Sequence, residues 1–290
     1  MSDRPEISAI IIAFNGIKFL PDCLTTLTAD LAGIFAEIIV VDNGSRDGSA
    51  EFVAKNFPSV HVIANGENVG FARGVNMGVK SAHGEYLYVL NQDLRFRAGA
   101  TSALLDRIKR DASVGMIGPK YVGFDGRLQH SARAFPTYKH VFYEMLLLSR
   151  IFPHSREFGS WRMSWFDHER ERFVDQPMGS VMLIPRSVLE KAGLFDESFP
   201  IFFNDVDFCR RLKAAGYKRL YYPEAVVEHY VGGSTRTRPL RMKYESHRSM
   251  YRYLHKYARW YEYPVLWLCG ILLLIAVLPA AIIASRRKPT

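Results

Sequence analysis

Two common nucleotide-binding signatures are missing from this sequence. The first predicted strand, residues 7–13, runs into Phe14-Asn15-Gly16, and no G-x-G-x-x-G motif follows it. The phosphate loop G-x-x-x-x-G-K-[ST] is also missing. These absences argue against a dinucleotide-dependent dehydrogenase and against a P-loop NTPase, although a nucleotide bound by other means remains compatible with the sequence.

Cysteine is scarce, and a secretory leader is not apparent. The three cysteines, Cys23, Cys209 and Cys269, lie far apart, and no two have the spacing of a metal-binding motif. An odd number of cysteines predicts a reducing compartment rather than a disulfide framework. Charged residues at positions 3, 4 and 6 precede an apolar run of only eight residues, which is not the pattern of a signal peptide.

The positive charge of the chain is confined to its last fifth. Residues 1–235 hold 27 Lys and Arg and 27 Asp and Glu, whereas residues 236–262 carry +6 and residues 286–288 carry +3 of the net +9. Because the first 235 residues have no basic surplus, nucleic acid is not expected as a partner. A basic C-terminal segment favours a membrane surface instead.

The segment 263–285 is apolar and holds no charged residue over 23 positions. As a helix rising ~1.5 Å per residue it would extend ~34 Å, which is enough to cross a bilayer. Tryptophan and tyrosine at positions 260, 261, 263 and 267 suit a membrane interface. Pro279 also allows a helix that lies in the interface, and a buried core helix is the alternative. Six basic residues between Arg241 and Arg259 predict that the preceding part of the chain lies in the cytosol.

Predicted strands alternate with predicted helices over the first 120 residues. The expected strands are 7–13, 37–41, 60–64, 86–90 and 114–117, and the expected helices are 19–27, 49–56, 74–82 and 98–110. This alternation predicts an α/β fold with a doubly wound, mostly parallel sheet. Residues 120–175 are less regular and contain one expected helix near 141–151. Beyond them we expect a strand at 180–184, helices at 186–192 and 205–215, and short strands at 218–222 and 225–227.

Polar clusters stand just after several of these strands, at residues 15–16, 42–45, 68–76 and 91–93. The carboxyl ends of parallel strands share one edge of a sheet, where α/β proteins bind their ligands. A carboxylate there can accept a hydrogen bond from the imide N–H of uracil or thymine, or hold a divalent cation beside a diphosphate. Each cluster taken alone is also explained by turn formation.

In their order along the chain, these blocks resemble glycosyltransferase family 2, whose inverting members have the GT-A fold, and within it the bacterial rhamnosyltransferases. The blocks are VVDNGSRDGS, NVGFARGVNMG, LNQD, MGSVMLIPRSVLEKAGLFDESF and NDVDFCRRLKAAGY, and the resemblance covers about residues 5–235. We therefore expect a GT-A domain over residues 1–235. A basic, aromatic helical segment (236–262), a membrane-spanning or interfacial helix (263–285) and a basic tail (286–290) would follow it.

The resemblance also implies which residues bind the donor. Phe14 and Asn15 would line the pocket for the nucleobase and ribose, and Asp42 would bind the pyrimidine N3–H. A further set would shape the nucleotide and sugar site: Asn68, Gly70, Phe71, Arg73 and Asn76.

For the metal, the resemblance points to the LNQD block. Asp93 stands at the last position of the family's D-x-D motif, and Asn91 replaces the acid at the first position. Asp93 would therefore carry Mg²⁺ or Mn²⁺ largely alone. His229, in VVEHYVGGS, resembles a histidine that completes the metal or diphosphate shell in related enzymes, and a purely structural histidine is the alternative.

Asp205 matches the aspartate of the family's acidic-Asp pair, with Asn204 at the preceding position. The resemblance makes Asp205 the base that removes a proton from the acceptor hydroxyl in a single, inverting displacement. Stabilisation of a helix N-terminus by Asp205 and Asp207 is the alternative. Asp196 and Glu197 are other candidate carboxylates, which we interpret as turn and acceptor-site residues.

By resemblance, dTDP-L-rhamnose is the first donor to consider and UDP-hexoses come next. The expected acceptor is a polyprenyl-linked or other cell-envelope glycan, and membrane lipids are expected partners at the cytosolic face of the bacterial inner membrane. The many aromatic residues over 135–165 suit sugar rings or lipid headgroups, and ordinary packing is the alternative. A truncation near residue 240 is expected to be soluble and to keep sugar-nucleotide binding.

Two other functions stay open. A nucleotidyltransferase would need a glycine-rich basic loop after the first strand, which AFNGIKF does not supply. A non-catalytic, membrane-tethered protein that binds nucleotide sugars would be consistent with Asn91 and Asn204 at positions where the family has acids.

Overall fold

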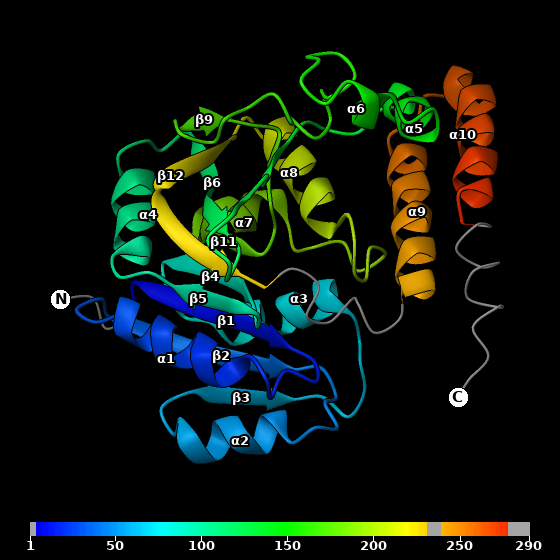
Figure 1. Ribbon diagram of the computed structural model, residues 1–290. Coiled ribbons are helices and arrows are strands. Elements are labelled where there is room, and N and C mark those ends of the chain that lie inside the picture. The colour runs from blue at the N-terminus through cyan, green and yellow to red at the C-terminus, as the bar shows by residue number, and fades with distance from the viewer. Residues whose placement is uncertain (1–3, 231–238, 278–290) are drawn as a thin grey trace.

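The computed structural model describes residues 4–230 and 239–277 of the chain (Figure 1). Its strands are β1 (Ile7–Ala13), β2 (Ala36–Asp42), β3 (His61–Ala64), β4 (Tyr86–Asn91), β5 (Leu94–Phe96), β6 (Val114–Val122), β7 (Leu128–Gln129), β8 (Ala132–Arg133), β9 (Arg172–Phe173), β10 (Gln176–Pro177), β11 (Val181–Pro185) and β12 (Lys218–His229). Its helices are α1 (Leu20–Asp30), α2 (Ser49–Asn56), α3 (Phe71–Ser81), α4 (Ala100–Lys109), α5 (Tyr138–Met145), α6 (Leu148–Ile151), α7 (Arg186–Ala192), α8 (Asn204–Ala214), α9 (Pro239–Lys256), the 3₁₀ turn η1 (Trp260–Glu262) and α10 (Tyr263–Ile275).

A single large sheet runs through the molecule in the order β3-β2-β1-β4-β11-β6-β12-β5. The pairs β2–β3, β1–β2, β1–β4 and β6–β12 are parallel, whereas β11 and β5 run antiparallel to their neighbours. The mixed α/β fold with a mostly parallel sheet that the sequence predicts is therefore confirmed.

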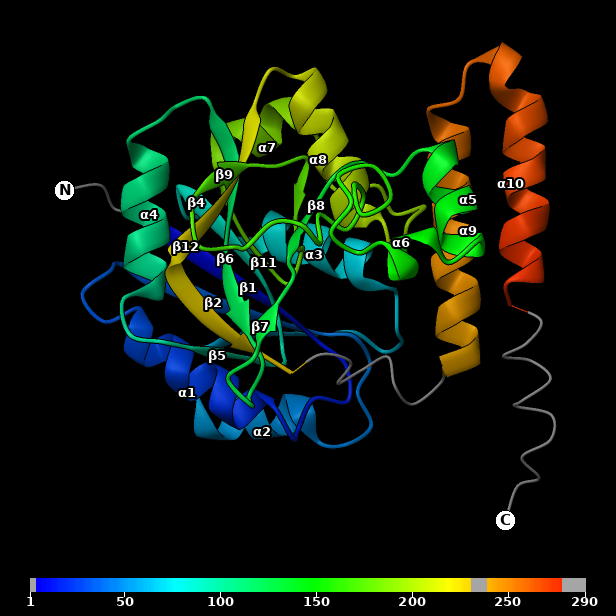
Figure 2. The same ribbon diagram turned by 45° about the horizontal axis from the view of Figure 1, so that its top comes forward.

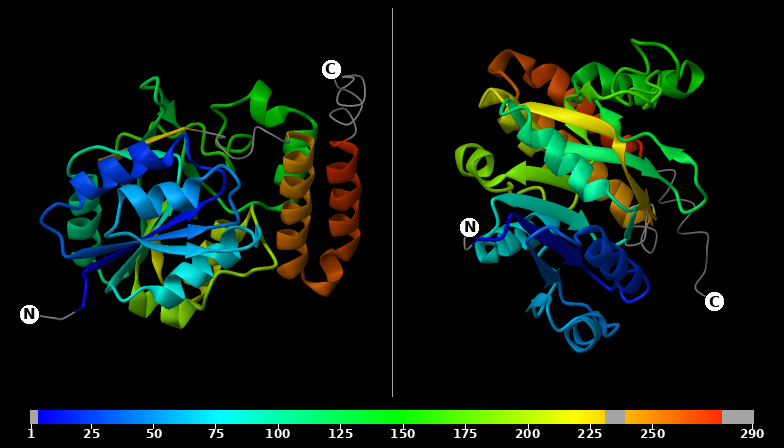
Figure 3. Two further views of the ribbon diagram at one scale, coloured as in Figure 1. Left: turned by 90° about the horizontal axis from the view of Figure 1, so that it is seen from below. Right: turned by 90° about the vertical axis from the view of Figure 1, so that its left-hand side faces the viewer.

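Helices cover both faces of this sheet (Figure 3). The side chains of β1 alternate between two apolar clusters, with Ile7, Ala9 and Ile11 packed among residues of α1 and α4, and Ile10 and Ile12 packed among residues of α3, α7 and α8. Burial on both faces explains why the first strand is continuously apolar rather than alternating.

Several predicted elements differ in the structure. The helix expected near 141–151 is divided into α5 and α6, because Leu147 between them adopts a left-handed backbone with φ of 58°. The two strands expected over 218–227 form one strand, β12, with a register shift between Tyr222 and Val226. That interval contains Pro223, which has no N–H to donate to a neighbouring strand. Helix α3 begins three residues before its predicted start.

The C-terminal helices α9 and α10 pack side by side at one flank of the α/β domain (Figures 1 and 2). A third apolar cluster joins them to the domain and contains Phe199, Phe203, Val206, Met250, Tyr253, Leu254, Leu266, Cys269 and Leu273. Of the segment predicted to lie in the membrane, residues 263–275 form α10, whereas 278–285 and the basic tail 286–290 lie outside the described residues. Within residues 4–230 and 239–277, no helix combines the length and the apolar character needed to span a bilayer.

Candidate functional site

Asp42 ends β2 at the edge where the parallel strands terminate, here called the carboxyl edge. Its carboxylate is 3% exposed, and its Oδ2 accepts a hydrogen bond of 2.9 Å from the Ser45 backbone N–H. The other oxygen, Oδ1, is buried and has no hydrogen-bond partner among the described residues. Because a buried acceptor without a donor is costly, this oxygen is suited to an N–H group of a ligand.

The loop after β1 is held beside Asp42 by two neighbouring loops. The Phe14 backbone N–H donates to Gln92 Oε1 (2.9 Å), and Gln92 Nε2 donates back to the Phe14 carbonyl (3.0 Å). Asn15 has a left-handed φ of 47°, which asparagine tolerates well, and its N–H donates to Ser45 Oγ (2.8 Å). Phe14 and Asn15 are thus placed at the carboxyl edge, as predicted, by a glutamine whose role the sequence did not reveal.

The Asn68–Phe71 segment forms the turn that leads into α3. The Gly70 N–H donates to Asn68 Oδ1 (2.9 Å), and the Gly70 carbonyl accepts from Asn43 Nδ2 (3.0 Å). Gly70 has φ of +88°, and a Cβ atom there would lie 2.9 Å from Pro200, so glycine is required on both counts. Asn43, a buried residue that we did not single out from the sequence, therefore links the second and third polar clusters.

Asn76 and Arg73 point from α3 toward the loop that precedes α8. The buried Asn76 amide donates to the Phe195 carbonyl and to Glu197 Oε1 (both 2.9 Å) and accepts from the Phe195 N–H (2.9 Å). Arg73 lies 4.0 Å from the Glu197 carboxylate. Since Asn76 uses both ends of its amide within the protein, it holds this loop in place against α3.

Asp93 and His229 come together at the end of β4, although 136 positions separate them in the chain. Both are buried, and His229 Nε2 lies 3.6 Å from Asp93 Oδ1. Burial lowers the pKa of His229 to about 4, so the imidazole is neutral near pH 7. Gln129 Nε2 donates to the His229 carbonyl (2.7 Å), which places Gln129 Oε1 3.0 Å from His229 Nδ1. This arrangement puts the ring proton on Nδ1 and directs the Nε2 lone pair toward Asp93.

One divalent ion fits between these two groups by the chemistry of the donors. A carboxylate oxygen and a neutral imidazole nitrogen 3.6 Å apart need only a small adjustment to share an ion at ~2 Å from each. Among the described residues, no group of three or more His, Cys, Asp and Glu side chains is arranged as a metal site. Two protein ligands would leave the remaining coordination positions to a diphosphate and water, which is how Mg²⁺ is commonly held.

Asn91, at the first position of the motif that ends in Asp93, donates its side-chain amide to Ser180 Oγ (3.2 Å).

Asp205 lies in the first turn of α8. Its Oδ2 accepts a hydrogen bond from Gln176 Nε2, and its Oδ1 accepts from the Val206 N–H (2.9 Å). Burial raises the pKa of Asp205, and the hydrogen bond from Gln176 and the charge of Arg133 oppose that rise. A carboxylate with a raised pKa is the stronger base, as removal of a hydroxyl proton requires.

Asn204, the departure from the family's acidic pair, has a structural reason. Its buried amide donates to the carbonyl oxygens of Ile201 (2.8 Å) and Phe199 (3.4 Å). A glutamate has no N–H to donate and would place its charge against those two carbonyl groups. Asn204 therefore shapes the turn that leads into α8, and Asp205 remains beside it as the carboxylate of that pair.

The other carboxylates near α8 are engaged in contacts that hold the fold together. Asp207 is fully buried and accepts from Arg211 Nε (2.9 Å), Tyr257 Oη (2.7 Å) and Lys256 Nζ (2.5 Å). Asp196 also accepts from Lys256 Nζ (2.7 Å). Together with the contact between Glu197 and Asn76, these bonds favour Asp205 over Asp196, Glu197 and Asp207 as the base.

A short chain of contacts links Asp205 to Asp93, and Asp42 lies farther along the same edge. Ser180 Oγ lies 3.4 Å from His229 Nε2, and the Ser180 carbonyl accepts from the Asn91 N–H (3.0 Å). A Cβ atom on the preceding residue, Gly179, would lie 2.7 Å from the Asp205 carboxylate. On the other side, β1 separates β2 from β4, so Asp42 lies about two strand spacings, ~10 Å, from Asn91. The three predicted carboxylates therefore lie along one edge of the sheet in the order Asp42, Asp93, Asp205.

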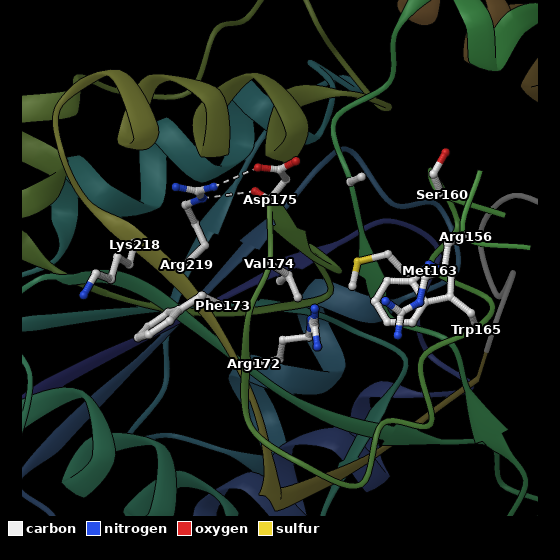
Figure 4. Close-up of a pocket in the computed structure, with 11 residues that line it drawn as sticks. Arg156, Ser160, Met163, Trp165, Arg172, Phe173, Val174, Asp175, Lys218 and Arg219 are labelled. Atoms are coloured by element: carbon white, nitrogen blue, oxygen red, sulfur yellow. Dashed lines mark hydrogen bonds and ion pairs between the residues drawn. The ribbon is translucent and has the colours of Figure 1, made fainter. Parts of the chain in front are cut away.

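A cavity of about 460 Å³ lies away from this edge (Figure 4). Its lining includes Trp165, Arg172, Lys218 and Arg219. Lys218 begins β12 and His229 ends it, so the cavity and the Asp93–His229 pair lie at opposite ends of that strand. Arg219 donates to the side chain (3.2 Å) and the carbonyl (3.1 Å) of Asp175. The cavity is therefore separate from the Asp93–His229 pair, whereas its lining residue Asp175 directly precedes Gln176, which donates a hydrogen bond to Asp205.

Comparisons with known proteins agree with this arrangement. Residues 8–173 match the model of Glycosyl transferase family 2. An N-acetylglucosaminyl-diphospho-decaprenol L-rhamnosyltransferase from Mycobacterium tuberculosis is 28% identical over 246 residues, covering 79% of this chain and 78% of that protein. A low-salt glycan biosynthesis hexosyltransferase from Haloferax volcanii is 25% identical over 212 residues, covering 72% of this chain and 62% of that protein.

A solved mannosyltransferase from Pyrobaculum calidifontis, in complex with GDP-Man and Mn²⁺, is similar in fold, with a TM-score of 0.58 and 16% identity. The similarity covers 100% of this chain and 77% of that one. The family match spans more than half of the chain and includes the polar ends of β1, β2 and β4. On this evidence the chain belongs to glycosyl transferase family 2 and is a glycosyltransferase.

Proposed function

We propose that the protein transfers a sugar, L-rhamnose from dTDP-L-rhamnose in the first instance or a hexose from a UDP-sugar, to a hydroxyl of a lipid-linked or other cell-envelope glycan. The observation that carries this proposal is the series of groups along the carboxyl edge. Asp42 Oδ1 stands at one end, the Asp93–His229 pair in the middle and Asp205 at the other end. The nucleobase and the diphosphate of a donor, followed by the hydroxyl of an acceptor, need such groups in that order.

The Asp42 oxygen suits a nucleobase with a ring N–H beside a carbonyl, a feature of thymine and uracil and also of guanine. Thymine and uracil both carry an N3–H that a buried carboxylate oxygen accepts, whereas cytosine and adenine carry no ring N–H at the corresponding position. The relative from Mycobacterium tuberculosis is named as an L-rhamnosyltransferase that acts on a decaprenol-linked sugar. This name supports rhamnose as the first sugar to test and a polyprenyl-diphosphate-linked saccharide as the first acceptor.

The mechanism that we propose is a single displacement. The diphosphate of the donor lies beside Asp93 and His229, which would hold Mg²⁺ or Mn²⁺; such an ion neutralises the charge that develops on a departing diphosphate. Asp205 accepts the proton of the acceptor hydroxyl while that oxygen forms a bond to the anomeric carbon. The bond from that carbon to the diphosphate oxygen breaks, and the configuration at the carbon inverts.

We also propose that the protein works at the cytosolic face of the bacterial inner membrane, anchored through its C-terminal part. The support comes from the sequence, since the whole positive surplus lies in residues 236–290 and the uncharged segment 263–285 lies within them. The rival function of a non-catalytic binding protein gains no support from the two asparagines. Asn204 and Asn91 donate hydrogen bonds within the fold, so neither needs a loss of catalysis to explain it.

A thermal-shift screen of nucleotide sugars tests the donor class. At a concentration 100 times its Kd, a ligand stabilises the folded state by about 2.7 kcal/mol, which raises the melting temperature of a chain of this size by about 5 °C. We expect dTDP-L-rhamnose or a UDP-sugar to give this shift with Mn²⁺ and a smaller one without it. Asp42→Asn should weaken binding about tenfold or more by loss of the charged acceptor.

Asp106→Asn is the matched control, because Asp106 is an exposed aspartate on α4. This control should leave the shift unchanged. A screen in which no dTDP- or UDP-sugar stabilises the wild-type protein, with or without a metal, would contradict the proposed donor class.

A further inference from the structure

One face of α10 is apolar and exposed. Trp267, Leu268, Ile271, Leu274 and Ile275 are 46–63% exposed, whereas Leu266, Cys269 and Leu273 are buried against the rest of the protein. At 100° per residue the five exposed side chains fall within an arc of about 120°. The helix therefore packs on the molecule with one side and presents a continuous apolar strip on the other.

A second exposed apolar group comes from the catalytic domain itself. Leu146, Leu147, Ile151 and Phe152, at the junction of α5 and α6, are 48–64% exposed. Helix α5 packs against α10, with Val141 in the same apolar cluster as Leu266 and Cys269. In Figures 1 and 2, α5, α6, α9 and α10 lie on the same flank of the molecule. We call the two exposed groups together the apolar flank.

The chemistry around the apolar flank favours a lipid surface as its occupant. Trp260 and Tyr261, 81% and 53% exposed, stand just before α10, and Arg259 donates to Tyr261 Oη (2.7 Å). An exposed Arg150 lies between the exposed side chains of the α5–α6 junction. Aromatic and arginine side chains beside an apolar face are typical of segments that lie in a membrane interface. Residues 236–262 carry a net charge of +6; Lys256 turns inward to Asp196 and Asp207, and the remaining basic surplus would add attraction to anionic lipids.

We propose that the apolar flank docks the protein on an anionic lipid surface, and that the α5–α6 junction inserts there together with the outer face of α10. This proposal deepens the proposed function and rests on its lipid-linked acceptor. Phe203 and Val206, on either side of Asp205, belong to the same apolar cluster as α10. Contact of the flank with a bilayer would therefore bring the catalytic aspartate close to the surface that holds the lipid of the acceptor.

Co-sedimentation of the full chain with vesicles tests the proposal. We expect binding to vesicles of phosphatidylcholine with about one third phosphatidylglycerol, and weaker binding to phosphatidylcholine alone. Two double variants, Ile151→Ser with Phe152→Ser and Ile271→Ser with Leu274→Ser, should each weaken binding roughly tenfold or more, because each removes two exposed apolar side chains from the flank. The control Phe35→Ser alters an equally exposed aromatic residue next to β2 and should leave binding unchanged.

Each result has a definite meaning. Unchanged binding of the Ile151→Ser, Phe152→Ser variant would overturn the role of the α5–α6 junction. Lack of vesicle binding, with a concentration-dependent dimer that either double variant abolishes, would assign the flank to a second copy of the chain and overturn the proposal. The same preparations are tested for thermal shifts with nucleotide sugars. Vesicle binding without any such shift would refute the donor class alone, and a shift without vesicle binding would refute the docking face alone.

Discussion

Asp205→Asn is expected to slow sugar transfer by about 10²–10⁴-fold while the protein stays folded. The substitution removes the group that accepts the proton but keeps a side chain of the same size. Its amide oxygen can still accept the bond that Asp205 Oδ1 takes from the Val206 N–H. The rate is measured as labelled sugar transferred at saturating donor, with the melting temperature and donor binding recorded in parallel.

Glu197→Gln provides the matched control for this experiment. Glu197 is a carboxylate in the loop before α8, and it already accepts a hydrogen bond from Asn76. We expect this variant to keep the rate of transfer at saturating acceptor within about threefold, because its carboxylate has no part in the proton transfer. A normal rate in Asp205→Asn, or an equal loss in Glu197→Gln, would remove Asp205 from the role of base.

The pH dependence of transfer should report the same group. Because burial raises the pKa of Asp205, the rate of the wild-type protein should fall as the pH drops through that raised pKa and the carboxylate becomes protonated. The hydrogen bond from Gln176 favours the charged form. Gln176→Leu therefore raises the pKa further and moves the acid limb of the profile to higher pH, and an acid limb that stays in place would contradict this role of Gln176.

Removal of residues 239–290 is expected to destabilise the catalytic domain by several kcal/mol, with loss of the soluble folded form. The truncation would strip Lys256 and Tyr257 from the fully buried Asp207, and loss of a partner from a buried charge typically costs about 3–5 kcal/mol. It would also expose the apolar side chains of Phe199, Phe203 and Val206 that α9 and α10 cover. This expectation replaces the one drawn from the sequence, that a chain ending near residue 240 is soluble and binds donor.

Lys256→Met tests the same contact with a single change. We expect a loss of about 1–3 kcal/mol in the free energy of unfolding, since Lys256 is one-third exposed while Asp207 has no exposure. Arg241→Met, an exposed substitution on the same helix, should change that free energy by less than about 0.5 kcal/mol. Urea unfolding of both variants measures the difference. Equal stabilities of the two variants would show that the contact between Lys256 and Asp207 contributes little.

Local patterns in the sequence pointed to the ends of strands as places for polar groups, and the family resemblance then singled out Asp42, Asp93 and Asp205. Asp42 ends an apolar strand, Asp93 stands two residues after the end of another, and Asp205 lies in the first turn of a helix with apolar spacing, so each lies at the end of a recognisable element. The parallel order of the strands then predicts that Asp42 and Asp93 share an edge. In the structure Asp42 and Asp93 do share that edge. Both faces of β1 and β4 are buried, which places these two strands in the middle of the sheet.

The partners of these carboxylates could not be predicted, because they depend on how distant segments meet. Gln92 binds the Phe14 backbone across 78 positions, and Gln176 reaches Asp205 across 29. Each is an ordinary polar residue in its own segment, and its role appears only in the folded chain. The basic C-terminal segment shows the same limit: its composition suggests charge that faces a membrane, yet Lys256 turns inward to Asp196 and Asp207.

The configuration of the new glycosidic bond tests the single displacement most directly. The protein is incubated with the donor that the thermal-shift screen selects and with a polyprenyl-diphosphate-linked acceptor, and the anomeric configuration of the product is determined by NMR. A direct attack by the hydroxyl that Asp205 deprotonates predicts that the product has the opposite anomeric configuration to the donor. A product that retains the configuration of the donor would require a second displacement and would contradict the mechanism.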